Sequence, residues 1–216
     1  MNFSTETKRR IAALTLAASV VPLLSGCFGA VAVGAGAGAL IASDRRPSET
    51  YLADEGTEIR ASSRISDKYG DKVHVNTTSY NRTVLITGEV PDEATKADVE
   101  KIVAGLPNVK FTQNELRIAS ISPFSARTND SYITSKVKAR FIDYNRFRAN
   151  LVKVVTENRA VYLMGMVTKA EADNAVDIAR TTADVAKVVR VFDIIPDTEA
   201  HRLDAGPAGG NAQPSK

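Results

Sequence analysis

The residues that could support catalysis are few and lie far apart in the sequence. The 216 residues include two histidines, His74 and His201, and a single cysteine, Cys27. A metalloprotease needs two histidines on one helical face, and a serine hydrolase needs a base with an orienting acid; neither histidine has such a partner. We interpret His74 as an exposed strand residue. We therefore predict no enzyme activity, no metal site, no cofactor and no small-molecule substrate.

A second group of residues combines basic and aromatic side chains. Ser131 to Ala149 contains five bases and one acid, whereas Glu58 to Lys72, at the matching place in an earlier repeat, contains four bases and three acids. Near an anionic membrane each base contributes about 1 kcal/mol of attraction, and Tyr and Phe suit the headgroup region. The pattern predicts a surface that binds anionic phospholipid. The candidate residues are Tyr132, Lys136, Lys138, Arg140, Phe141, Tyr144, Arg146, Phe147 and Arg148.

Two other interpretations of this stretch remain open. Ile133, Val137 and Phe141 recur every four residues, so they can form the buried face of a helix. An exposed basic helix face is often only solvated. Nucleic acid would use the same charges, but the export signal at the N-terminus argues against that partner.

The single cysteine lies at the end of a secretory signal. Residues 8–10 are basic and residues 11–21 are apolar, and this run is too short to span a bilayer of roughly 30 Å. Residues 23–27, Leu-Leu-Ser-Gly-Cys, resemble a bacterial lipobox, which implies cleavage before Cys27 and lipid attachment to its thiol. Phe28 rather than Asp follows, and resemblance to sorted lipoproteins then implies the outer membrane, facing the periplasm.

The segments at the two ends of the mature chain have unusual composition. Gly34, Gly36 and Gly38 superficially suggest a nucleotide loop, but no strand precedes them and an exported protein rarely meets such a cofactor. We interpret residues 27–50 as a lipidated, Gly/Ala-rich linker. Residues 197–216 are rich in Gly, Pro, Ala, Asn and Ser and are predicted to be disordered.

Between these ends the chain contains an internal repeat. Residues 84–90 (VLITGEV) recur as 161–167 (VYLMGMV), at an offset of 77. Residues 109–118 recur as 185–194, at an offset of 76. The repeat predicts two homologous domains. Their expected bounds are residues 51–119 and 129–196, with a linker over 120–128.

Each repeat has the same predicted order of elements. A helix comes first, and two β-rich runs across a short polar turn follow it as a hairpin. A second helix comes next; in repeat two, Thr168 and Glu171 predict a capping box at its start. The last strand is parallel to its neighbour because a helix crosses between them. The expected ranges are helix 59–65, strands 73–77 and 84–90, helix 99–106 and strand 112–118 in repeat one, and helix 131–144, strands 151–156 and 160–167, helix 172–183 and strand 188–194 in repeat two.

This order predicts an α+β fold class, with two tandem αββαβ domains that each have two helices packed on a three-stranded mixed sheet. Gly88 and Gly165 lie at the same place in the second strand of each repeat, and they indicate a bulge or a close backbone approach. Domains this small bury only about 60% of their unfolded surface. We therefore expect the two domains to stabilise each other.

With the lipobox, linker and both repeats present, the chain resembles the BON-domain family, and within it outer-membrane lipoproteins with two such domains. The family motif, apolar-x-apolar-x-Gly-x-Val, stands at 84–90 and 161–167, and Asn-Glu-Leu follows at 114–116. Asn108 and Asp184 stand before valine where the family usually has glycine. The resemblance implies a role in outer-membrane integrity, with anionic phospholipid bound mainly by the second domain.

We therefore predict a lipoprotein whose second domain binds anionic phospholipid through the helix 131–144 and the loop after it. The alternative is a periplasmic adaptor whose sheet edges, or the 144–147 loop, bind envelope proteins such as an assembly machine or a cell-wall enzyme. The formal net charge does not separate the two, because +3 falls to +1 when residues 1–26, with three bases and one acid, are removed.

Overall fold

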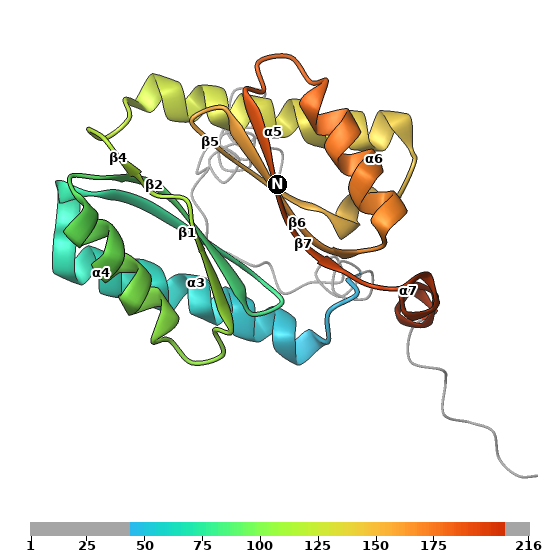
Figure 1. Ribbon diagram of the computed structural model, residues 1–216, viewed down its shortest axis with the longest axis horizontal. Coiled ribbons are helices and arrows are strands. Elements are labelled where there is room, and N and C mark those ends of the chain that lie inside the picture. Colours follow the sequence, from blue (N-terminus) through green and yellow to red (C-terminus); the bar gives the residue numbers. More distant parts are fainter. Residues whose placement is uncertain (1–43, 206–216) are drawn as a thin grey trace, which may run out of the picture. The chain divides into compact units, whose positions relative to one another are not determined.

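The computed structural model describes residues 44–205, so Cys27 and most of the predicted linker lie outside the described residues. Both repeats have the predicted order of helix, hairpin, helix and strand, which confirms the α+β fold class (Figure 1). Domain 1 comprises α3 (Ser48–Tyr69), β1 (His74–Tyr80), β2 (Thr83–Val90), α4 (Glu93–Ala104), β3 (Phe111–Asn114) and β4 (Arg117–Ile118). Domain 2 comprises α5 (Phe124–Tyr144), β5 (Lys153–Glu157), β6 (Ala160–Val167), α6 (Lys169–Arg180), β7 (Lys187–Ile194) and α7 (Asp197–Asp204).

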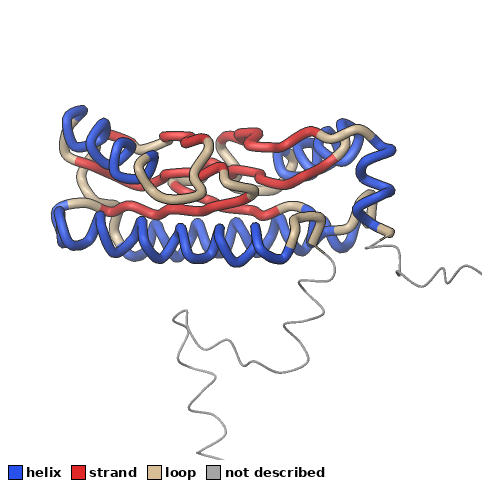
Figure 2. Tube along the Cα trace, turned by 90° about the horizontal axis from the view of Figure 1, so that it is seen from below, coloured by secondary structure: helices blue, strands red, loops and turns tan. Residues whose placement is uncertain are grey.

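Each sheet is mixed and has the second strand of the repeat at its centre. In domain 1, β1 pairs antiparallel with β2, and β3 and β4 pair parallel with the other edge of β2. In domain 2, β5 pairs antiparallel with β6, and β7 pairs parallel with it. The parallel pairs arise because α4 and α6 carry the chain back across the sheet. Helices and strands form separate layers (Figure 2).

Both helices of a domain pack on the same face of its sheet. Val84 and Ile86 of β2 point to this face in domain 1 and contact residues of α3 and α4. Val161 and Leu163 of β6 do the same in domain 2. All four are fully buried, because alternate residues of a strand share a face. Each domain therefore has its own core between sheet and helices.

The opposite faces of the two sheets share a third core. Tyr80 and Leu85 of domain 1 cluster with Tyr162 and Met164 of domain 2, and none of the four is more than 6% exposed. The backbone N–H of Met166 donates to Tyr80 Oη at 3.4 Å. Burial raises the pKa of Tyr80 to about 12, so this phenol stays neutral. Each domain therefore covers the second apolar face of the other domain's sheet.

The hairpin turns are fixed by the helix that precedes them. The two central residues of each turn, 81–82 and 158–159, have positive φ between 48° and 67°, as in the type I′ turns that suit two-residue hairpins. In domain 1, Asp54 of α3 accepts hydrogen bonds from both turn amides at 2.7 and 2.9 Å. In domain 2, Asp130 of α5 accepts from both at 2.8 Å. Each buried aspartate therefore fastens the first helix to the hairpin.

Three helices begin directly after a proline, at positions that the composition of the sequence did not predict. Pro47, Pro123 and Pro196 directly precede α3, α5 and α7, with φ between −54° and −67°. Proline fixes φ near −65° and fits just before a first helical turn. The linker and tail predictions were therefore wrong in part. Helical residues occupy 48–50 of the predicted 27–50 linker, 124–128 of the predicted 120–128 linker and 197–204 of the tail predicted as disordered over 197–216.

The last strand of domain 1 is broken, whereas its counterpart β7 is continuous. We predicted one strand over 112–118, but it divides into β3 and β4. Between them Leu116 turns into the core, where it is 2% exposed. The side chain of Asn114 accepts the freed N–H of Leu116 at 3.2 Å, which compensates for the interruption.

The two residues that replace the family's glycine take up a glycine-like backbone. Asn108 and Asp184 have φ of 69° and 72°. Among residues other than glycine, Asn and Asp enter this left-handed region most readily. The turn before the last strand therefore keeps its geometry in both repeats.

The glycines of β2 and β6 lie where any larger residue would contact the neighbouring backbone too closely. A Cβ added at Gly88, where φ is +117°, would overlap the carbonyl oxygen of His74, and one at Gly165 would overlap that of Leu151. We expect Gly88→Ala and Gly165→Ala each to lower the free energy of unfolding by about 1–3 kcal/mol in urea denaturation. The control is Gly56→Ala, where the nearest atoms belong to the flexible side chain of Arg60. It should be neutral or stabilising, and wild-type stability of Gly165→Ala would contradict the close approach.

Candidate functional site

Two aromatic residues of the predicted phospholipid surface belong to the core of domain 2. Phe141 is fully buried and Phe147 is 8% exposed, and their rings meet edge to face with centroids 5.0 Å apart. Phe141 continues the buried stripe of Ile133 and Val137 along α5. The prediction that Phe141 and Phe147 contact lipid was therefore wrong, because the stripe faces the sheet.

Five other candidates form a continuous surface. Residues at a spacing of four are neighbours on a helix, and Lys136 Nζ lies over the ring of Tyr132, 4.8 Å from its centre. The guanidinium of Arg140 lies 5.1 Å from the centre of the Tyr144 ring, and that of Arg146, in the following loop, lies 5.4 Å from it. Rings and cations therefore lie against one another along one flank of α5. We call this set the basic aromatic ridge: Tyr132, Lys136, Arg140, Tyr144 and Arg146.

Residues from α6 and the turn after it hold the ridge in place. Lys136 forms an ion pair with Asp184, and its hydrogen bond keeps the pKa of Asp184 below the usual value. Arg140 donates to the carbonyl of Ile178 at 3.0 Å and to the hydroxyl of Thr182 at 2.8 Å. These contacts fix the side-chain orientations of Lys136 and Arg140, the two cations in the middle of the ridge.

Lys138 and Arg148 do not join the ridge. Lys138 is two residues from Lys136, about 200° further around the helix, and it lines a hollow on the other flank together with Ile142. Arg148 pairs with Asp204 at the end of α7. Ile142 is 68% exposed and was missed from the sequence. In the sequence, its exposure is indicated only by its position outside the buried stripe of α5.

Arg45, just before α3, binds domain 2 and not the domain that follows it in sequence. Its side chain is 2% exposed and forms ion pairs with Glu171 at 2.7 Å and with Asp204 at 2.9 Å. It also donates to the carbonyl of Met166 at 2.9 Å. Glu171 additionally forms the predicted capping box with Thr168 at the start of α6. We call these contacts the Arg45 clamp; the sequence had suggested only a polar linker here.

The clamp changes the acidity of its carboxylates. Hydrogen bonds from Arg45 hold the pKa of Asp204 below its usual value. Burial is the largest influence and favours a raised pKa for Glu171, but the hydrogen bonds from Arg45 and from the backbone of Thr168, together with the positive charge of Arg45, outweigh it and the pKa is lowered. Both groups therefore remain charged at neutral pH.

His74 is not the exposed strand residue that we expected from the sequence. Its side chain is 15% exposed, and Nδ1 lies 2.9 Å from Oε2 of Glu89, the residue opposite it in the hairpin. Asn76, two residues along β1, donates to Glu157 of domain 2 at 3.0 Å. Burial raises the pKa of Glu157, and the nearby carboxylates of Glu89 and Asp130 add to the effect.

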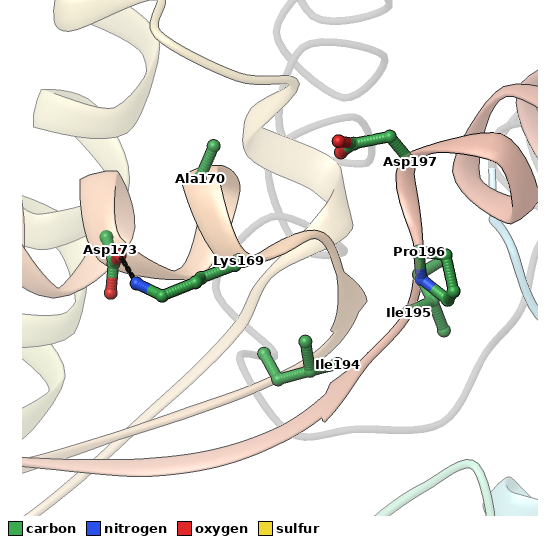
Figure 3. A pocket seen from close by; sticks show the side chains of 7 residues that line it. All are labelled: Lys169, Ala170, Asp173, Ile194, Ile195, Pro196 and Asp197. Carbon is green, nitrogen blue, oxygen red and sulfur yellow. Dashed lines mark hydrogen bonds and ion pairs between the residues drawn. The ribbon is translucent and has the colours of Figure 1, made fainter.

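A hollow of about 620 Å³ lies where α6 begins and β7 leads into α7 (Figure 3). Lys169 and Asp173 line it and form an ion pair with each other. Ile194, at the end of β7, adds an apolar side that is 53% exposed. A small-molecule site needs polar groups that converge on an enclosed ligand. The exposed and mutually paired charges of this hollow do not form such a set.

Among the helices within residues 44–205, none combines the length and the apolar character needed to cross a membrane. Residues 58–120 and 129–196 both match the family described as BON domain. The chain therefore belongs to the BON-domain family and carries two copies of its domain.

The name of one relative agrees with the predicted location at the outer membrane. The chain is 34% identical over 182 residues to a Haemophilus influenzae protein named outer membrane lipoprotein DolP, covering 83% of this chain and 93% of that protein. It is 30% identical over 154 residues to the 21 kDa hemolysin of Actinobacillus pleuropneumoniae, covering 70% and 79%. Two solved chains of CdsD, a structural protein of the type III secretion system of Chlamydia trachomatis, align over 70% of this chain and 99% and 100% of their own length. Their TM-score of 0.28, at 13% and 11% identity, supports no conclusion.

Removal of the clamp arginine should destabilise the protein. We expect Arg45→Ala to lower the free energy of unfolding at pH 7 by about 1.5–3 kcal/mol, the range for hydrogen bonds to charged groups. Urea denaturation measures the loss, and Arg64→Ala, at an exposed position of α3, is the control that should change it by less than about 0.5 kcal/mol.

The size of this loss should depend on pH. Because the pKa of Asp204 is lowered in the folded state, the contribution of the clamp is complete above the unfolded-state pKa of about 4. It disappears as pH falls through the folded-state pKa. The stability difference between wild type and Arg45→Ala should therefore shrink below about pH 4, and a difference that persists unchanged to pH 2 would exclude these carboxylates as its source.

Proposed function

We propose that this protein is a lipid-anchored, non-enzymatic lipoprotein of the outer membrane that faces the periplasm, binds anionic phospholipid through its second BON domain and supports envelope integrity. The observation that carries the proposal is the basic aromatic ridge on α5. Tyr132 is 62% exposed and Tyr144 is 48% exposed, and each ring lies beside at least one cation. The first helix of domain 1 has no comparable alternation of rings and bases.

The ridge has the chemistry that a lipid headgroup layer requires. Arginine binds phosphate oxygens through two parallel N–H donors. Tyrosine suits the boundary between water and acyl chains, because its ring is apolar and its hydroxyl is polar. The exposed Ile142 on the neighbouring flank adds apolar surface.

The ion pair of Arg146, at the end of the ridge, is compatible with lipid binding. Arg146 lies 3.6 Å from Asp177, and both side chains are more than 40% exposed. Exposed ion pairs of this kind contribute at most about 1 kcal/mol. Near a surface with many phosphates, the cation can therefore exchange its carboxylate for a lipid headgroup.

The Arg45 clamp keeps domain 2 close to the predicted lipid anchor. Arg45 follows the predicted lipid attachment site at Cys27 by 18 residues, which can reach at most about 60 Å when fully extended. Because Arg45 is bound to domain 2, that domain stays within this distance of the membrane. Even a weak surface then becomes effective through its raised local concentration. This mechanism requires no catalytic turnover. The names of the family and of the relative DolP likewise do not describe an enzyme.

Vesicle flotation tests the proposal. The protein used is the chain from residue 27 onward with Cys27→Ser, so that no lipid anchor contributes. It should float with phosphatidylglycerol vesicles at low salt, dissociate as salt shortens the Debye length, and not float with phosphatidylcholine. The triple variant Lys136→Ala, Tyr144→Ala and Arg146→Ala should bind about 30-fold more weakly, because two bases at about 1 kcal/mol each are lost.

A matched triple variant in domain 1 serves as control. Lys101→Ala, Lys110→Ala and Phe111→Ala also remove two bases and one ring, all at exposed positions. This variant should float like the parent. Equal loss in both variants would show only non-specific charge attraction. Failure of the parent to bind either lipid at low salt would favour the alternative of a periplasmic protein adaptor.

A further inference from the structure

The interface between the two BON domains contains a compact cluster of potential metal ligands. His74 of β1 and Glu89 of β2 lie opposite each other in the hairpin of domain 1, and Glu157 at the end of β5 comes from domain 2. One nitrogen of the imidazole and one oxygen of each carboxylate all lie within 4.8 Å of one another. Neither domain alone supplies the full set.

The cluster concentrates negative charge away from water. Glu89 is 2% exposed and Glu157 is 7% exposed. Within residues 44–205, neither carboxylate forms an ion pair with a lysine or arginine, and the only basic partner is the imidazole of His74. Buried carboxylates without compensating charge are strongly unfavourable. A cation at the centre of the cluster would neutralise them.

We propose that His74, Glu89 and Glu157 form a site for a divalent metal ion that bridges the two domains, with Zn²⁺ as the preferred ligand. An imidazole together with carboxylates is a donor set suited to zinc and its first-row neighbours, whereas Mg²⁺ and Ca²⁺ take oxygen ligands alone. Zinc bonds to such ligands are about 2 Å long, so the ligands of one ion lie roughly 3–4 Å apart. Side-chain adjustments of about 1 Å bring the three groups to that spacing.

Neighbouring groups already orient the proposed ligands. The backbone N–H of Ser122, in the link between the domains, donates to Glu89 at 3.2 Å. The side chain of Asn76 donates to Glu157 at 3.0 Å and lies 3.3 Å from Nε2 of His74. Hydrogen bonds of this kind around metal ligands fix their direction and support affinity. Water would complete the coordination.

The cluster is not a general consequence of the repeat. Gly88 approaches the carbonyl of His74 and Gly165 approaches that of Leu151, so Leu151 is the counterpart of His74 in domain 2. The residue after Gly165, Met166, is likewise the counterpart of Glu89. These residues have neither an imidazole nor a carboxylate. The repeat therefore supplies the cluster at only one of its two equivalent places.

Calorimetric titration with ZnCl₂ tests the proposal on the mature protein, purified in detergent without a polyhistidine tag and stripped with a chelator. Wild type should bind one equivalent of Zn²⁺. His74→Ala and Glu157→Gln should each weaken binding by at least about tenfold. The control, His201→Ala, removes the only other histidine and should leave binding unchanged. Absence of saturable binding near one equivalent, or wild-type affinity of a folded His74→Ala variant, would overturn the proposal.

A measurement on wild type removes any dependence on the folding of variants. Co²⁺, which shares zinc's preference for nitrogen and oxygen ligands, shifts and broadens NMR signals of nearby amides. One equivalent should affect amides of β1, β2 and the end of β5, and addition of Zn²⁺ should reverse the effect. Perturbations confined to one domain, or centred on exposed acids elsewhere, would contradict a site shared between the domains.

Discussion

A three-stranded sheet with helices on only one face leaves its other face apolar and open to water. In both BON domains that second face carries large residues, among them Leu85 of β2 and Met164 of β6. Burial of apolar surface contributes roughly 25 cal/mol per Å², so the two faces gain most by covering each other. This constraint makes the pair of domains, and not either domain alone, the stable unit. It also brings His74 and Glu89 of domain 1 into reach of Glu157 of domain 2.

The geometry of α5 determines which residues can meet a ligand. Its core stripe takes Phe141 out of the candidate surface, and the helical repeat separates Lys138 from Lys136. What remains is a flank on which rings and cations lie against one another. The same helix thus packs on the core with one side and carries the proposed recognition surface on the other. The spacing of four residues, shared by both sides, accounts for the error in the sequence-based assignment.

Much of the fold could be predicted from the sequence because its signals are local. The repeat, the hairpins and the capping box of Thr168 and Glu171 each depend on residues close together in the chain. The candidate site was less predictable, because burial depends on distant partners. Arg45 lies two residues before a proline in a polar stretch, and its partners follow 126 and 159 residues later. No local pattern indicates such contacts, and the same holds for His74 beside Glu157.

The Arg45 clamp also sets an order of events during biogenesis. A chain is synthesised from its N-terminus, so Arg45 is among the first described residues to emerge and Asp204 among the last. The contact between them closes a loop of 159 residues. Until α7 has been made, Arg45, which follows the predicted anchor, lacks one of its two acidic partners. Arg45 can therefore gain both acidic partners only after residue 204 has been made.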